Sequence, residues 1–163
     1  MEMIKLTIDN RIVEVEKGTT IYKAAKMLDI EIPILCYMNL EHLDIENKPG
    51  GCRICVVEVV GRRNLAPSCS TKAEEGMLVK TSSMRVINAR RTVMEFILSD
   101  HPKECLTCSK SGSCDLQTMA IKLGVRHIPN EETCEMSTYR LDTSPSIIRN
   151  LDKCIMCRRC ETM

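Results

Sequence analysis

Eleven cysteines in a chain of 163 residues constrain this protein more than any other feature of its sequence. Most of them occur in Cys-x-x-Cys pairs, their number is odd, and the opening MEMIKLTIDN does not resemble a secretion signal. Cytoplasmic thiols stay reduced, and closely spaced reduced thiols are more often metal ligands than disulfides. We therefore expect a cytoplasmic protein whose cysteines bind metal.

The rest of the composition excludes several classes of function. The chain has 23 basic and 22 acidic residues and no basic stripe interleaved with aromatics, which argues against nucleic acid as a partner. No apolar run approaches the roughly 20 residues of a membrane span, so no membrane partner is expected. We find no phosphate loop, nucleophile elbow or acid/base pair, hence no catalytic residue, and enzymatic activity of the chain alone stays open.

The first group of cysteines has the wide spacing C-x15-C-x2-C-x13-C. Gly50 and Gly51 precede its central pair and permit the main chain to approach a bulky cluster closely. Four thiolates satisfy a [2Fe–2S] cluster, but a zinc site is the alternative, since Cys-x-x-Cys pairs also bind zinc. The members of this group are Cys36, Cys52, Cys55 and Cys69.

The second group combines three thiols with an imidazole in DHPKECLTCSKSGSC. It consists of His101, Cys105, Cys108 and Cys114. A Cys3His set suits structural zinc as well as iron, so the residues alone leave the metal open. If the metal is iron, an imidazole in place of a thiolate removes negative charge and should raise the reduction potential, as in Rieske centres.

The third group lies in DKCIMCRRCETM, where Cys154, Cys157 and Cys160 form C-x2-C-x2-C. This pattern opens the bacterial ferredoxin run, whose fourth cysteine follows three residues later. The chain stops one position before that cysteine, so we expect it to be part of a longer protein with an incomplete [4Fe–4S] set here. Cys134 belongs to none of the groups and is predicted to be a bystander.

Periodicity predicts an α+β chain with four parts. A hairpin (3–7 and 12–16), a helix capped by Thr19 or Thr20 and ending near Asp29, and strands at 56–60, 65–67 and 78–81 form residues 1–81. Helices at 84–98 and 113–123 belong to residues 82–128, followed by a linker at 129–146 and the last motif at 147–163. In the first of these helices we expect an apolar face of Val86, Ala89, Val93 and Ile97, with Arg85, Arg90 and Arg91 mostly off it.

Five stretches together resemble one family: GGCRICVVEV, GRRNLAPSC, LSDHPKECLTC, SGSCDLQ and IIRNLDKCIMCRRCET. They are similar to the N-terminal iron–sulfur region of the catalytic subunit of NAD(P)-reducing, electron-bifurcating [FeFe]-hydrogenases, over essentially the whole chain. The large subunit of NADH dehydrogenase and formate dehydrogenase α-subunits have the same architecture at their N-termini.

The resemblance implies a plant-ferredoxin-like β-grasp domain with a [2Fe–2S] cluster on the first group. It further implies a small, mainly helical domain with a [4Fe–4S] cluster on the second group, and the truncated start of a bacterial-type ferredoxin domain at the third. Implied partners are a flavin- and NAD(P)-binding subunit and a thioredoxin-like [2Fe–2S] subunit; a homo-oligomer stays open.

The function that follows is an electron relay between a hydrogen-activating site, absent from this chain, and the flavin subunit. The parent would be an NAD(P)-dependent hydrogenase. The alternatives are the equivalent relay domain of a formate dehydrogenase or NADH dehydrogenase, and, in another class, a zinc-stabilised interaction module.

Overall fold

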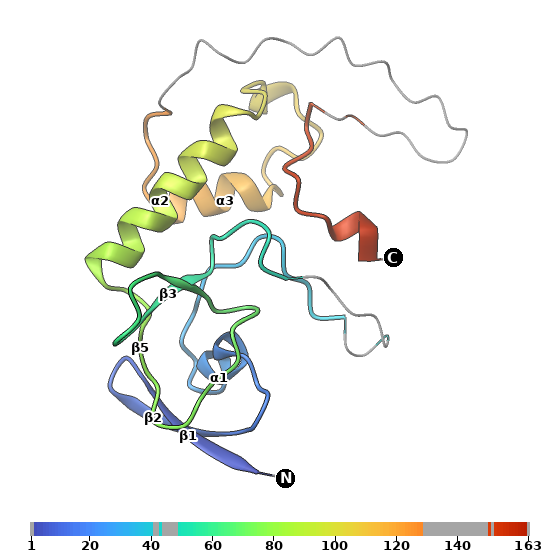
Figure 1. Ribbon diagram of the computed structural model, residues 1–163. Helices are drawn as coiled ribbons and strands as arrows, with labels where there is room; N and C mark the ends of the chain where they lie inside the picture. Colours follow the sequence, from blue (N-terminus) through green and yellow to red (C-terminus); the bar gives the residue numbers. More distant parts are fainter. Residues whose placement is uncertain (1, 41–42, 44–48, 129–149, 151, 163) are drawn as a thin grey trace. The chain divides into compact units, whose positions relative to one another are not determined.

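The computed structural model describes residues 2–40, 43, 49–128, 150 and 152–162. The chain divides into two compact units, which are described separately: Met1–Arg90 with Arg158–Met163, and Arg91–Cys157. Figure 1 follows the order of their elements along the chain. In the described part of the chain, no helix is long and apolar enough to cross a membrane.

The first unit is built on a five-stranded sheet whose strand order is β2-β1-β5-β3-β4. Strand β1 is antiparallel to β2 and parallel to β5, while β3 is antiparallel to both β4 and β5. The strands are β1 (Met3–Ile8), β2 (Arg11–Glu16), β3 (Val56–Val59), β4 (Ala66–Pro67) and β5 (Leu78–Lys80).

The predicted hairpin is confirmed and extends one residue further on each side of the turn. Asp9 and Asn10 form the turn with φ of 45° and 67°. Positive φ at both central residues is the geometry of a two-residue turn whose twist matches that of the strands, and Asp and Asn tolerate it. The alternation of apolar and polar residues then directs Leu6 and Ile8 into the core.

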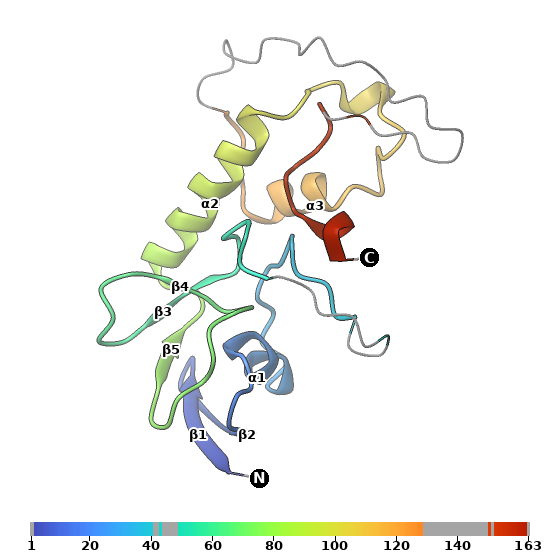
Figure 2. The same ribbon diagram turned by 45° about the vertical axis from the view of Figure 1, so that its right-hand side comes forward.

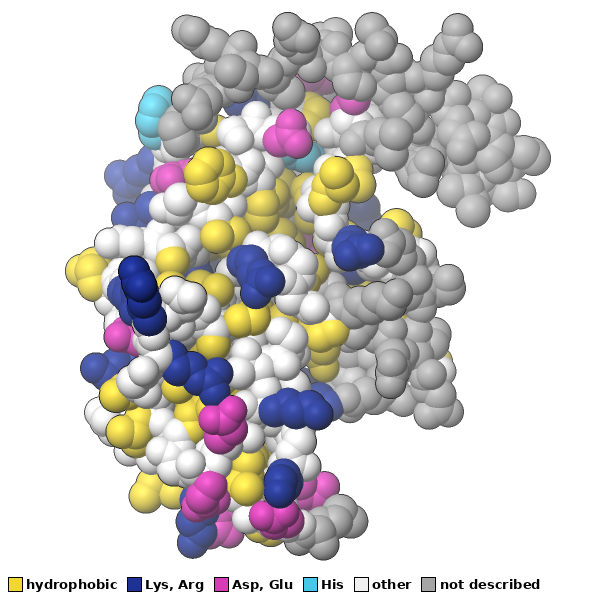
Figure 3. All heavy atoms as spheres, in the orientation of Figure 1, with side chains coloured by type: hydrophobic (Ala, Val, Ile, Leu, Met, Phe, Trp, Pro, Cys, Tyr) yellow, Lys and Arg dark blue, Asp and Glu magenta, His cyan; other side chains and the backbone are white. Residues whose placement is uncertain are grey.

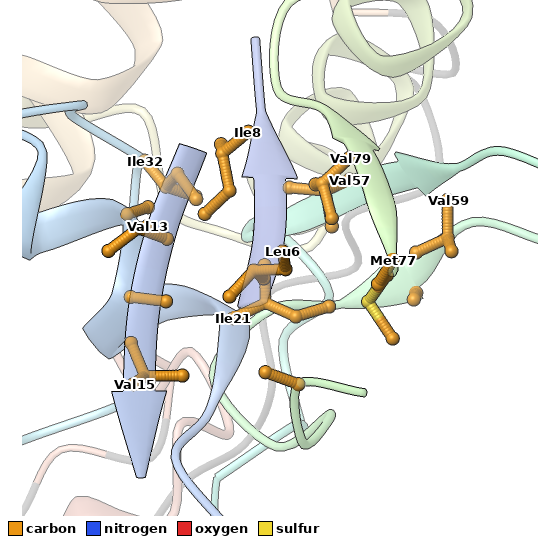
Figure 4. Packing of buried hydrophobic residues seen from close by; sticks show 14 of the residues in the cluster. Leu6, Ile8, Val13, Val15, Ile21, Ile32, Val57, Val59, Met77 and Val79 are labelled. Carbon is orange, nitrogen blue, oxygen red and sulfur yellow. The ribbon is translucent and has the colours of Figure 1, made fainter. Parts of the chain in front are cut away.

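Helix α1 (Ile21–Met27) packs its apolar face against this sheet. The Thr20 side chain accepts a hydrogen bond from Lys23 N at 3.4 Å, which confirms one of the two predicted caps. Ile21, which is fully buried, points from the helix toward the side chains of β1 in the close view of Figure 4. The core is aliphatic, as expected for a chain with one Phe and no Trp.

The later elements are helical. They are α2 (Met84–Ser99), η2 (Cys105–Thr107), α3 (Asp115–Lys122) and η4 (Arg159–Thr162), and Figure 2 shows them from a second direction. Gly124 follows the end of α3 with φ of 67°, so the predicted C-terminal glycine has the left-handed conformation that ends many helices. The predicted linker 129–146 and Cys134 lie outside the described residues.

The predicted face of α2 is wrong in one important respect. Its fully buried residues are Val86, Arg90 and Met94, at a strict spacing of four, whereas Ala89 and Val93 are only partly buried. Arg90, expected off the buried face, is 6% exposed. The reason is a partner that sequence periodicity cannot show: the guanidinium donates to a backbone carbonyl of β3.

Basic and acidic side chains are interspersed on the face drawn in Figure 3. Three exposed ion pairs at 2.7 Å reflect this mixture, namely Lys5–Glu14, Lys17–Glu2 and Arg62–Glu74.

The strands and helices of the described residues together form a mixed α+β protein, in which a ferredoxin-like sheet is followed by a helical region.

Candidate metal centres

The four cysteines of the first group lie together in the first unit. Cys36, Cys55 and Cys69 are each no more than 2% exposed, and Cys52 is half-buried. The Sγ atoms of Cys55 and Cys69 are 3.2 Å apart. The thiols of Cys52 and Cys69 both hydrogen-bond to the thiol of Cys36. Residues separated by 33 positions in the sequence therefore present their sulfur atoms to one another.

Backbone N–H groups point at these sulfur atoms. Cys36 Sγ accepts from the main chain of Gly50 and Cys52, and Cys52 Sγ accepts from Ile54. Gly50 has φ of 97°, and a Cβ there would lie 3.2 Å from Ser70 Oγ, so a larger residue would be strained and crowded. The close approach of the main chain to a cluster, which the sequence predicts for Gly50 and Gly51, stays a prediction, and a Cβ at Gly51 would meet no atom within 4 Å among the described residues.

The same contacts favour the thiolate form at two positions. Hydrogen bonds from the Cys52 and Cys69 side chains hold the pKa of Cys36 far below its ordinary value. The hydrogen bond between the Cys55 and Cys69 side chains lowers the pKa of Cys55 to about 6, although burial acts in the opposite direction. The hydrogen bond to Cys36 raises the pKa of the donor Cys52. Donors aimed at thiolate sulfur are what an iron–sulfur cluster requires of its protein surroundings, so these residues fit such a group.

Ser68 fixes the loop that carries Cys69. Its buried Oγ donates to Cys55 O at 2.8 Å, and its backbone N–H donates to the same oxygen at 3.2 Å. Its carbonyl accepts from Tyr22 N, at the start of α1, at 3.0 Å. Two ligand candidates and the helix are thereby connected through a single serine. The cysteine spacing does not point to Ser68, and its signal in the sequence is a small hydroxyl residue next to a ligand candidate.

The second group surrounds a cavity of about 290 Å³ inside the second unit. His101, Cys105, Cys108 and Cys114 all line it, together with Lys153 and Leu116. Helix α2 ends at Ser99 just before His101, η2 begins at Cys105, and Cys114 is the residue that precedes α3. The end of α2, the short helix η2 and the start of α3 thus place the four side chains around the same cavity.

The imidazole of His101 has a vacant hydrogen-bonding atom. Its Nδ1 is buried and has no hydrogen-bond partner among the residues that the structure describes. Burial, followed by the charge of Lys153, lowers the pKa of His101, so the ring is held neutral. A neutral imidazole with a free nitrogen is the form that binds a metal. Since His101 and the three cysteines line the same cavity, the second group also fits one.

The third group is not gathered in the same way. Cys154 and Cys160 are exposed and Cys157 is half-buried. Met156 and Arg158, on either side of Cys157, have φ of 54° and 59°, so the backbone turns tightly between the cysteines.

Within the described ranges, no three His, Cys, Asp or Glu side chains converge as the ligands of a single metal ion do. The ligands of a cluster bind different iron atoms, so a looser arrangement of sulfur atoms is compatible with a cluster.

Comparison with known proteins agrees with this chemistry. Residues 1–84 match the family described as 2Fe-2S iron-sulfur cluster binding domain, and residues 90–129 match the NADH-ubiquinone oxidoreductase-G iron-sulfur binding region. Together with the gathered thiols, these two matches define an iron–sulfur protein with a [2Fe–2S] domain and a [4Fe–4S] binding region. Since residues 1–84 make up just over half of the chain, the protein belongs to the 2Fe-2S iron-sulfur cluster binding domain family.

Individual relatives extend the likeness to the whole chain. The NADP-reducing hydrogenase subunit HndD of Solidesulfovibrio fructosivorans is 62% identical over 100% of this chain and 28% of the relative. A subunit of the NADH-quinone oxidoreductase of Rhizobium meliloti is 39% identical over 99% of this chain and 18% of the relative. The chain therefore spans less than a third of either protein.

A solved structure shares the fold. The crystal structure of an NAD+-reducing [NiFe]-hydrogenase in the H2-reduced state superimposes with a TM-score of 0.80, at 30% identity, over 96% of this chain and 64% of that one. The resemblance predicted from the five sequence stretches is confirmed: the chain is homologous to the N-terminal iron–sulfur regions of an NADP-reducing hydrogenase subunit and of an NADH-quinone oxidoreductase subunit.

Proposed function

We propose that this chain is the electron relay of a multi-subunit NAD(P)-linked [FeFe]-hydrogenase. The observation that carries the proposal is the presence of two separate groups of ligands on one short chain, one buried in a sheet domain and one around a cavity. Electrons would pass between these groups on the way from the hydrogen-activating site to a flavin- and NAD(P)-binding subunit. The 62% identity to an NADP-reducing hydrogenase subunit supports this parent.

The proposed ligands follow from the two gathered groups. Cys36, Cys52, Cys55 and Cys69 would hold the [2Fe–2S] cluster. The [4Fe–4S] cluster would be held by His101, Cys105, Cys108 and Cys114. The match of each region to an iron–sulfur family supports iron in both sites over the zinc alternative.

The finer division of the chain is also part of the proposal. The strand order, with a parallel pair of β1 and β5 at its centre, supports a plant-ferredoxin-like β-grasp for residues 1–81. Residues 82–128 would form the domain of the second cluster. The spacing of Cys154, Cys157 and Cys160 supports the start of a bacterial-type ferredoxin domain at 147–163, after a linker at 129–146.

The protein's own contribution is to hold the clusters and to set their potentials. When bound, the clusters supply one-electron chemistry. Backbone N–H groups directed at the sulfur of Cys36 and Cys52 stabilise negative charge there, which raises the potential. His101, with its unpartnered Nδ1, would contribute a neutral ligand in place of a thiolate. The burial of Cys55 and Cys69 keeps water from the first site.

The proposed parent enzyme, a multi-subunit hydrogenase, also implies which subunits this chain would contact. They would be the flavin- and NAD(P)-binding subunit and a thioredoxin-like [2Fe–2S] subunit. The likeness to an NAD+-reducing [NiFe]-hydrogenase supports an electron path toward a nicotinamide-reducing partner. Co-purification of the chain with these subunits tests the assignment, and the absence of both from an intact complex would contradict it.

The central experiment is metal analysis of anaerobically prepared protein. We expect iron and acid-labile sulfide, visible absorption, and two EPR signals after reduction, one of each cluster type. Folded, colourless protein that contains zinc in place of iron would refute the relay.

A second parent is favoured by one observation. The 39% identity to an NADH-quinone oxidoreductase subunit also fits a relay that serves quinone reduction. The two parents are distinguished by hydrogen-dependent reduction of the chain's clusters in the complex purified from its source, which only the hydrogenase would show.

A further inference from the structure

Arg90 is the one charged side chain of the described residues that is buried, with 6% of its surface exposed. It extends from α2 to the backbone of β3. Its Nε and Nη2 both donate to Val56 O, at 3.1 and 2.8 Å. Val56 directly follows Cys55, so the guanidinium is anchored one residue from a proposed cluster ligand.

The charge of Arg90 lacks a counter-charge in direct contact. Among the described residues no ion pair of Arg90 is found, and its two hydrogen bonds go to a neutral carbonyl. Asp9 attracts it only from a greater distance, and the Asp9 carboxylate accepts from Thr81 N at 2.8 Å and from Thr81 Oγ1. Burial lowers the pKa of Arg90 to about 10, so the side chain still carries its positive charge at neutral pH.

A buried cation is unfavourable unless an anion compensates it. The Cys55 thiolate is among the charges that act on Arg90. Four thiolates and the bridging sulfides give a [2Fe–2S] cluster a net negative charge, which grows by one when an electron is added without a proton. The anion that Arg90 lacks would therefore be supplied by the group that the neighbouring cysteines hold.

We propose that Arg90 is the fixed positive charge that compensates the [2Fe–2S] cluster and keeps its reduction potential high. The inference rests on the proposed assignment of that cluster to Cys36, Cys52, Cys55 and Cys69. A nearby cation stabilises the reduced, more negative cluster more than the oxidised one, because the Coulomb attraction scales with the charge. Removal of the charge lowers the potential, whereas its retention on another side chain preserves it.

The test is an EPR-monitored redox titration of the full 163-residue chain, reconstituted anaerobically with iron and sulfide. Arg90→Gln and Arg90→Met remove the charge, and Arg90→Lys keeps it. Arg91→Gln is the matched control, since Arg91 is the adjacent, exposed arginine and donates to Leu123 O in the second unit. The titration follows the [2Fe–2S] signal in each variant.

At the potential where half of the wild-type cluster is reduced, we expect the ratio of reduced to oxidised cluster to fall about tenfold in the neutral variants. For a one-electron couple this corresponds to about 59 mV. Arg90→Lys should remain within about twofold of the wild type, and Arg91→Gln should be unchanged. If Arg90 had a purely structural role, the reduction potential of the [2Fe–2S] cluster would not depend on whether the substituted side chain at position 90 is charged.

The other outcomes are also decisive. Unshifted potentials in the neutral variants, or equal shifts in the neutral and Lys variants, overturn the inference. If the neutral variants lose the cluster, retention in Arg90→Lys supports the inference and loss there too overturns it. A wild-type chain without a [2Fe–2S] signal refutes the proposed function itself, which is a different failure from a signal with an unchanged potential.

Discussion

The two candidate centres differ in how deeply the protein encloses their side chains. In the first unit, three of the four thiols are buried and backbone N–H groups point at the sulfur atoms. In the second unit, Cys105 is exposed, Cys108 and Cys114 are half-buried, and the four side chains surround an open cavity.

The cores of the two units explain this difference. Among the described residues, only Met94 and Leu116 are buried apolar residues of the second unit, whereas the first unit contains a continuous aliphatic cluster. A sheet with such a core holds a ligand loop by itself. A short helical region gains much of its stability from the metal that its side chains bind. The four predictions below test this contrast.

The largest effect is expected from the loss of one buried ligand. Cys55→Ala should abolish the [2Fe–2S] EPR signal while the [4Fe–4S] signal persists, because the two ligand groups lie in different units. The first unit should also unfold at a lower temperature, since cluster binding and folding are coupled. Cys134→Ala, outside both groups, is the control and should retain both signals. Simultaneous loss of both clusters in Cys55→Ala would show that the units are not independent.

Removal of iron should affect the second unit more than the first. After treatment with a chelator under reducing conditions, we expect the amides of α3 to lose hydrogen-exchange protection by roughly 100-fold, because local opening there is opposed by little buried surface. The amides of β1 and β5, which lie at the centre of the sheet, should change much less. Hydrogen exchange followed by mass spectrometry measures both. Equal loss in the two regions would remove the contrast.

His101→Cys should retain the second cluster with a lower potential. The thiolate adds negative charge where the neutral imidazole had none, so the ratio of reduced to oxidised [4Fe–4S] cluster at the wild-type midpoint should fall about tenfold. A redox titration monitored by EPR measures the change, and the [2Fe–2S] couple in the same sample is the internal control. An unchanged [4Fe–4S] couple means that His101 is not a ligand.

The smallest effect is expected at the surface of the first unit. Arg62 Nη2 and Glu74 Oε1 form an exposed ion pair at 2.7 Å. Glu74→Gln should lower the free energy of unfolding by no more than about 0.5 kcal/mol, because solvent screens such a pair. Chemical denaturation at low and high salt measures the loss, and high salt should remove it. A larger, salt-independent loss would mean that the stability of this unit does not come mainly from its core.

Much of the fold was predictable because it depends on local patterns. The alternation in the hairpin, the Thr20 cap and the glycine after α3 each act over a few residues, and their elements were predicted to within one or two residues. The cysteine spacings predicted which residues would lie together in the first two groups, since a ligand set leaves its pattern in the sequence.

Arg90 was not predictable in the same way. Arg90 lies four residues after Val86 and four before Met94, and a charged residue at such a position indicates an interruption of an apolar helix face. It becomes a buried residue only because a carbonyl at Val56, 34 positions away, accepts its two N–H groups. The contact is tertiary, and periodicity within one helix carries no information about it. The same holds for Ser68, whose role depends on Cys55 and on the start of α1.

The position of β5 in the sheet has a consequence for synthesis on the ribosome. Strand β5 lies between β1 and β3, and Thr7 of β1 pairs with Leu78 of β5. The N-terminal hairpin therefore exposes an unpaired edge of β1 until residue 80 has left the exit tunnel. Such a long sequence separation slows folding. Nascent chains arrested before β5 emerges should therefore be sensitive to protease, and those arrested well after α2 should be resistant.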